Sequence, residues 1–149
     1  MRAALLFVIG LAWSTGACGG AQRDADNLAE SIRTFNEGVR WQRYANAAVY
    51  VPAPQRSKFV DEMDERGEDL KVTDYEIVKV DNRGPREARV QVKVSWYKDS
   101  EGTLRETHAV QTWELHGKAW LMVDESRLRG AEMPGLQEIM MKDEGPHGP

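Results

Sequence analysis

The chain has a single cysteine, Cys18, so it can form no intramolecular disulfide. Its three histidines lack the short spacings of a zinc site, and the sequence predicts no bound metal and no other cofactor. Positive charge is not in excess either, since 24 acidic residues against 20 basic ones give a formal net charge of −4. A nucleic-acid interface or a polybasic membrane patch needs clustered positive charge, so we expect neither.

Long apolar runs are also missing, with one exception near the N-terminus. After Arg2, apolar residues run from 3 to 13, and the small residues Ser14–Ala17 then precede Cys18. This arrangement is typical of a secretory signal peptide, and the run is too short to cross the roughly 30 Å of bilayer hydrocarbon. The segment resembles the bacterial lipoprotein signal, in which the cysteine is acylated and becomes the N-terminus.

That resemblance implies an exported protein that is anchored in a membrane of the cell envelope by a lipid on Cys18. It predicts a signal peptide over 1–17 and a tether over 18–25. Gly19 favours the outer membrane, with the protein facing the periplasm or the cell surface. Two alternatives stay open, because ordinary signal peptidase can cut after Ala17, or after Ala21 with loss of Cys18.

Helical periodicity dominates the first half of the remaining chain. Apolar residues recur three or four positions apart over 28–39, and further helical stretches are predicted over 41–49 and 54–67. Asp24 or Asp26 can cap the first of these helices, because its carboxylate accepts hydrogen bonds from free backbone N–H groups.

The second half has the two-residue period of β-strands. Strands are predicted over 70–80, 88–97, 103–115 and 119–124, and the links between them are short. Short links favour strands that are neighbours in space as well as in sequence. We therefore expect an α+β fold in which two to three N-terminal helices pack on a curved, four-stranded antiparallel meander sheet.

Three segments carry a family resemblance: aromatic-rich helices over 35–51, the opening of a strand over 74–77, and two tryptophans around a glycine turn within 110–121. Together they resemble the nuclear-transport-factor-2-like superfamily, which includes SnoaL-like and ketosteroid-isomerase-like proteins with a cystatin-like cone. The resemblance implies a conical domain over 26–129. Beyond Arg129, glycine, proline and charge increase, which predicts a flexible C-terminal tail over 130–149.

Aromatic residues are the candidates for lining a ligand pocket in such a domain. Pockets are concave and mostly apolar, but buried aromatic residues also dominate ordinary cores, and we favour the core. The five candidates are Trp41, Tyr44, Trp96, Trp113 and Trp120.

His108 and Glu106 are weak candidates for a catalytic acid/base pair. They share one face of the predicted strand over 103–115, so both would enter a cavity if that face were concave. A polar pair on the solvent face is the interpretation we favour. No residue matches the catalytic residues of ketosteroid-isomerase-like enzymes position by position.

Because no catalytic constellation is visible, the sequence favours a non-enzymatic, membrane-anchored periplasmic module. Its partner would be an envelope protein or a small apolar ligand. A small cavity enzyme of the SnoaL-like or ketosteroid-isomerase-like type is one alternative. A dimeric structural module is another, with Arg89, Gln91, Lys93 and Tyr97 at or near its interface.

Overall fold

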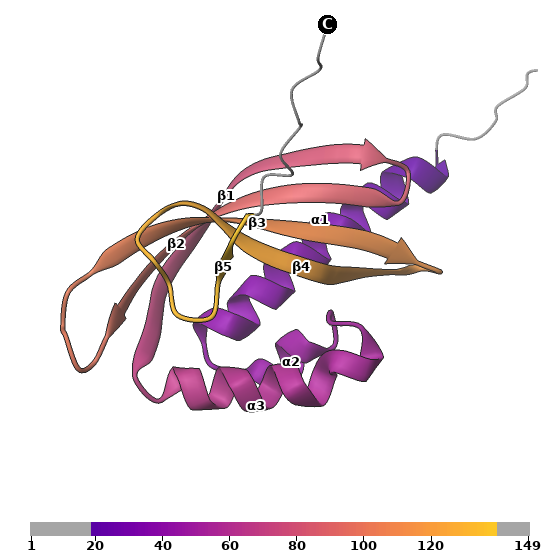
Figure 1. Ribbon diagram of the computed structural model, residues 1–149. Helices are drawn as coiled ribbons and strands as arrows, with labels where there is room; N and C mark the ends of the chain where they lie inside the picture. The colour runs from indigo at the N-terminus through magenta and orange to yellow at the C-terminus, as the bar shows by residue number, and fades with distance from the viewer. Residues whose placement is uncertain (1–18, 140–149) are drawn as a thin grey trace, which may run out of the picture.

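The computed structural model of the protein describes residues 19–139 and places helices before strands along the chain (Figure 1). The helices are α1 (Gly19–Arg40), α2 (Tyr44–Ala48), the short 3-10 helix η1 (Ala53–Gln55) and α3 (Arg56–Gly67). The strands are β1 (Leu70–Gly84), β2 (Glu87–Lys98), β3 (Arg105–His116), β4 (Ala119–Gly130) and β5 (Gln137–Glu138). The predicted signal peptide and Cys18 lie outside the described residues. None of the helices described has both the length and the apolarity to span a membrane.

The sheet is mixed and has five strands in the order β1-β2-β3-β4-β5. Neighbours from β1 to β4 are antiparallel, whereas β5 runs parallel to β4 through the pairs Ser126–Gln137 and Arg127–Glu138. The expected four-stranded antiparallel cone is therefore wrong. The chain turns at Gly130 and at Gly135, both at positive φ, and β5 then pairs alongside β4. For this segment the sequence predicted only a tail.

The helices lie on one face of the sheet, with α1 crossing it and α3 below (Figure 1). Leu28, Ile32 and Phe35, at helical spacing on α1, are buried against the strands. Alternate residues of β2 and β3 point toward these helices and are almost fully buried. They are Ala88, Val90, Val92, Val94 and Trp96 on β2, and Thr107, Ala109, Gln111 and Trp113 on β3.

The first helix begins before its predicted start. Residues 19–25, which the sequence assigned to a tether, form the first turns of α1. The helix is joined to the sheet near this end, because the indole N–H of Trp120 donates a hydrogen bond to the Asp24 carbonyl at 3.0 Å. An aspartate at this place therefore lies inside the helix instead of capping it.

Candidate functional site

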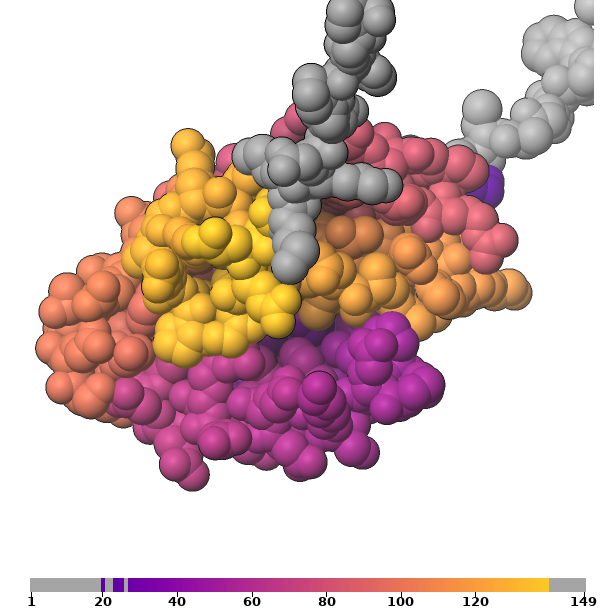
Figure 2. All heavy atoms as spheres, in the orientation of Figure 1, coloured from indigo at the N-terminus to yellow at the C-terminus, as the bar shows by residue number. Residues whose placement is uncertain are grey.

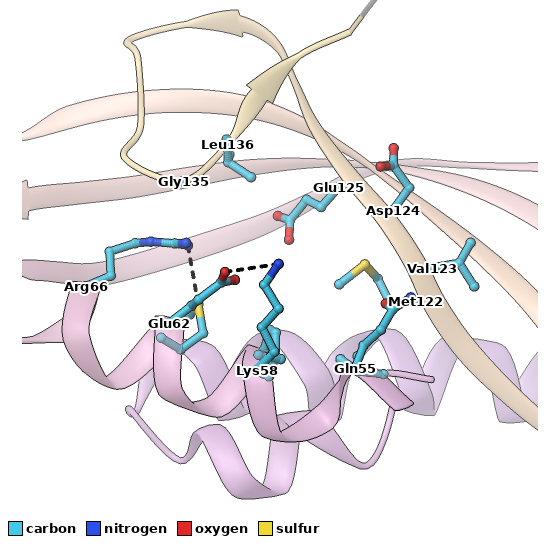
Figure 3. Close-up of a pocket in the computed structure, with 13 residues that line it drawn as sticks. Gln55, Lys58, Glu62, Arg66, Met122, Val123, Asp124, Glu125, Gly135 and Leu136 are labelled. Carbon is cyan, nitrogen blue, oxygen red and sulfur yellow. Dashed lines mark hydrogen bonds and ion pairs between the residues drawn. The ribbon is translucent and has the colours of Figure 1, made fainter. Parts of the chain in front are cut away.

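A cleft of about 410 Å³ opens between α3, β4 and the loop over 131–136 (Figure 3). In the space-filling view, the surface is hollowed where the yellow loop meets the magenta helices (Figure 2). Apolar side chains such as Val51 and Met122 share the lining with charged ones. Those that matter most below are Lys58, Glu62, Arg66, Glu125, Gly135 and Leu136.

A smaller cavity of about 50 Å³ lies next to the cleft, between α1, α3 and the sheet. Much of its lining is apolar and comes from α1, α3, β1 and β2, including Phe35, Val39, Val72 and Val94. Several residues line both spaces and so form the boundary between them. They are Phe59, Met63, Arg66, Glu125 and Leu136.

Glu125 faces the helices because β4 contains a bulge. Met122 pairs with Trp113, but the next pair is Asp124 with Thr112, so Val123 is an extra residue in the strand. The bulge inverts the alternation of side chains that follows it. Glu125 therefore lies opposite the buried Gln111, while Asp124 lies on the outer face with Thr112.

Gln111, which lies opposite Glu125 on β3, has an amide of fixed orientation. Its Nε2 donates to Asn36 Oδ1 at 2.9 Å. Its Oε1 accepts hydrogen bonds from Asn36 Nδ2 at 3.3 Å and from Trp113 Nε1 at 3.2 Å. Because two donors meet Oε1, the orientation of the amide is set, and its NH₂ group bonds Asn36.

Burial raises the pKa of the Glu125 carboxyl above its ordinary value, and this effect outweighs the hydrogen bond from Gln111 and the positive charge of Arg66. The neutral acid is thus favoured more than in water. No ion pair joins Glu125 to another residue in the described part of the chain. A neutral carboxyl has an O–H donor that it can direct into the cleft.

Arg66 lies at the same boundary, with its guanidinium in the space that a side chain at residue 135 would occupy. A Cβ atom at residue 135 would overlap this guanidinium, so glycine is what leaves room for it. Nη1 donates to the Met63 sulfur at 3.4 Å, and within residues 19–139 no carboxylate forms an ion pair with Arg66. A thioether is a weak acceptor, so most of the guanidinium's donor capacity stays available.

The five aromatic pocket candidates do not line the cleft or the adjoining cavity. Tyr44, Trp96, Trp113 and Trp120 are buried in the core. Trp41 is 59% exposed on the surface, where its indole N–H donates to Glu37 at 2.7 Å and Arg40 lies over its ring.

His108 and Glu106 lie on the outer face of the sheet, opposite Lys93 and Ser95 of β2. Glu106 is exposed and 4.0 Å from the Lys93 ammonium, whereas the buried Nδ1 of His108 has no hydrogen-bond partner among the described residues. The structure therefore does not bring this pair to the cleft. No group of three or more potential metal ligands occurs in the part of the chain described.

Sequence reasoning did not single out Glu125 or Arg66. Both sit among other charged residues, so they look like ordinary surface positions. The residue that could have indicated the site is Gln111, a polar residue on the same strand face as Ala109 and Trp113. A buried polar side chain needs a partner, which points to a polar group across the sheet.

Two solved structures are similar to this chain in fold. One is the solution structure of RPA3114, a SEC-C motif containing protein from Rhodopseudomonas palustris, with a TM-score of 0.57 and 10% identity over 72% of this chain and 91% of that one. The other is a conserved protein from Planctomyces limnophilus DSM 3776, with a TM-score of 0.54 and 12% identity over 70% of this chain and 94% of that one. No family model matches the sequence, and no match was found among curated proteins.

These likenesses overturn the resemblance drawn from the sequence. A five-stranded mixed sheet, shared with a SEC-C motif containing protein, replaces the expected nuclear-transport-factor-2-like cone. The comparisons give no support for classing the chain with lipoproteins. The tryptophan–glycine–tryptophan segment that suggested the superfamily forms an antiparallel hairpin between β3 and β4, an arrangement that many unrelated sheets contain.

Proposed function

We propose that the protein is a non-enzymatic binding module that holds a small ligand in the cleft between α3 and β4. The observation that carries this proposal is the boundary of the cleft, where Glu125 and Arg66 meet apolar side chains and form no ion pair with any other described residue. Ligand sites are typically concave spaces of about 300–1,000 Å³ with apolar walls and a few convergent polar groups. The cleft, at about 410 Å³, falls in that range.

The chemistry of the lining favours binding over catalysis. The residues that line the cleft and the adjoining cavity include no histidine, serine, threonine or cysteine. Nucleophilic catalysis through a hydroxyl, thiol or imidazole needs such a group within hydrogen-bond reach of a base. The weak sequence candidates His108 and Glu106 lie on the other face of the sheet.

A ligand panel tests the binding proposal. The purified, isotope-labelled chain is titrated with six-carbon compounds that carry neutral, cationic or anionic head groups, and backbone amide shifts are recorded. We expect saturable shifts at Met122 and Leu136, which line the cleft, and none at Val110 and Thr112 on the outer face. If no compound in the panel shifts the cleft amides, the proposal fails.

Two tryptophan substitutions, one in the cleft and one outside it, test where the ligand binds. Leu136→Trp places a large ring in the cleft and should abolish binding. Leu128→Trp adds the same ring at an exposed bulge of β4, so it should leave binding intact. Equal affinities in the two variants would place the ligand somewhere other than the cleft.

We also propose that the module is tethered to the cell envelope through a lipid on Cys18, facing the periplasm or the cell surface. Support for this comes from the sequence alone, in the apolar run and the small residues before the cysteine. Cys18→Ser should release the protein from the membrane fraction. Unchanged fractionation of this variant would contradict the tether and leave the cleft proposal untouched.

A further inference from the structure

We propose that the cleft selects a small organic carboxylate, with its anionic head between Arg66 and Glu125 and its apolar body toward the adjoining cavity. This inference rests on the proposed function, because it names the ligand class of the same cleft. Both residues line the cleft and the cavity, so a head group placed between them lies at the opening that connects the two.

Arg66 supplies the positive charge. A guanidinium has five N–H donors in a planar fork, accepts no hydrogen bond and stays charged at any working pH. Among residues 19–139 its guanidinium donates a hydrogen bond to the Met63 sulfur, and Gly135 leaves room for it at the boundary. A carboxylate matches the fork geometrically and accepts two hydrogen bonds from it at once.

Glu125 is the second polar group at the opening, and it lies opposite the buried Gln111 on the neighbouring strand. Burial favours the neutral acid in the folded protein. A ligand carboxylate thus meets a cation and, when Glu125 is protonated, an O–H donor, whereas a ligand ammonium would meet the guanidinium and be repelled.

The other charged or ionisable groups near Glu125 do not reverse the preference for a carboxylate over an ammonium. They are Lys58 and Glu62 on α3, Asp124 on β4 and Tyr75 on β1. Lys58 and Glu62 are exposed at the rim and pair with each other at 3.6 Å. Asp124 lies on the outer face with Thr112, and burial together with Glu37 raises the pKa of Tyr75 to about 12, so its phenol stays neutral.

The adjoining cavity limits the apolar part of the ligand. At about 50 Å³ it has room for on the order of two water-sized groups. Phe35, Val39 and Val94 form parts of its wall, and the boundary residue Met63 can adapt its shape because methionine has several rotatable bonds. Only the end of a short aliphatic chain therefore enters this cavity, and the rest of a six-carbon ligand lies in the cleft.

Three six-carbon probes test the inference by calorimetry on the purified chain: hexanoate, hexanamide and hexylamine. They share a chain length and differ in the charge of the head group. We expect hexanoate to bind at least about tenfold more tightly than hexanamide, as a charge-assisted hydrogen bond implies, and hexylamine to bind most weakly. Equal binding of hexanoate and hexanamide in the cleft overturns the inference but leaves the proposed function standing.

Substitutions of arginine test whether Arg66 is responsible for the preference for hexanoate over hexanamide. Arg66→Gln should remove the preference for hexanoate over hexanamide, whereas Arg89→Gln, at an exposed position on the outer face, should keep it. Arg66→Lys, a milder change, keeps the charge but loses the fork, so it should lower hexanoate affinity several-fold. Retention of the full preference in the Arg66 variants would overturn the inference. Failure of all three probes to bind would contradict the proposed function as well.

Discussion

The two faces of the sheet share an alternating pattern but have different chemistry. Toward the helices, Val92 and Trp113 are fully buried, and the polar Gln111 and Glu125 lie opposite each other on adjacent strands. On the outer face, charged side chains form ion pairs in water, as Lys93 does with Glu76 at 2.6 Å. The contrast teaches that a polar residue with buried neighbours says more about a ligand site than an ionisable residue on a solvated face.

The largest difference between the faces should appear when a core side chain is removed. Trp113 is fully buried and packs edge-on against Phe35, with ring centroids 5.8 Å apart. Trp113→Ala should lower the free energy of unfolding by about 3–5 kcal/mol, measured by urea denaturation. Thr112→Ala, the neighbouring outer-face change, should cost less than about 1 kcal/mol. Similar losses in the two variants would break the distinction between the faces.

The same glutamine-to-leucine substitution can be made on each face of the sheet, and its effects on stability can be compared. Gln111→Leu leaves Asn36 and the Trp113 indole without their buried acceptor and should cost about 1–3 kcal/mol of unfolding free energy. Gln91→Leu, on the half-buried outer face of β2, should change stability by about 0.5 kcal/mol or less. Equal effects in urea denaturation would mean that the buried hydrogen-bond network does not stabilise the fold.

Alanine substitutions at two glycines distinguish the cost of backbone strain from the effect of displacing Arg66. Gly135 and Gly102 both have positive φ, at 86° and 68°, so alanine at either site should cost about 1–2 kcal/mol. Open space surrounds Gly102, but a Cβ at residue 135 would push the Arg66 guanidinium aside. We expect Gly135→Ala alone to lower hexanoate affinity, measured by calorimetry. Equal affinity in the two variants would show that the position of the guanidinium is not needed.

The smallest effect concerns pH. Burial raises the pKa of Glu125 above its ordinary value of 4.5, so the folded chain holds this proton more tightly than the unfolded chain. The resulting stabilisation is present below pH 4.5 and is lost as the pH rises through the folded-state pKa. Glu125→Gln should therefore flatten the decline of melting temperature with rising pH above that value.

Glu106→Gln is the matched control for that measurement, because it removes one exposed carboxyl from the outer face. The slopes of the two variants against pH should differ. If Glu125→Gln gives the same slope as Glu106→Gln, the pKa of Glu125 is not raised in the folded protein as described.

Much of the secondary structure could be predicted from the sequence, because periodicity reflects burial directly. The strict alternation over 88–97 matches β2, and the helical spacing over 28–39 lies within α1. β5 could not be predicted in the same way. It is two residues long and is positioned by Gly130, Gly135 and pairing with β4, none of which leaves a periodic pattern.

The candidate site was harder to predict because a bulge changes which residues face inward. Strict alternation from Trp120 and Met122 would turn Asp124 toward the helices and Glu125 outward, the reverse of what the structure shows. Arg66 was equally hidden, since its place at the cleft depends on a glycine 69 positions later in the chain. Contacts between distant segments decide both cases, and a reading of local pattern cannot supply them.

The bulge at Val123 also gives the site a form of mutational robustness. Deletion of Val123 would restore regular pleating and keep Asp124 opposite Thr112 and Glu125 opposite Gln111. Glu125 would therefore still face the helices, and Asp124 would stay on the outer face. The identity of the acid at the cleft thus survives loss of the extra residue.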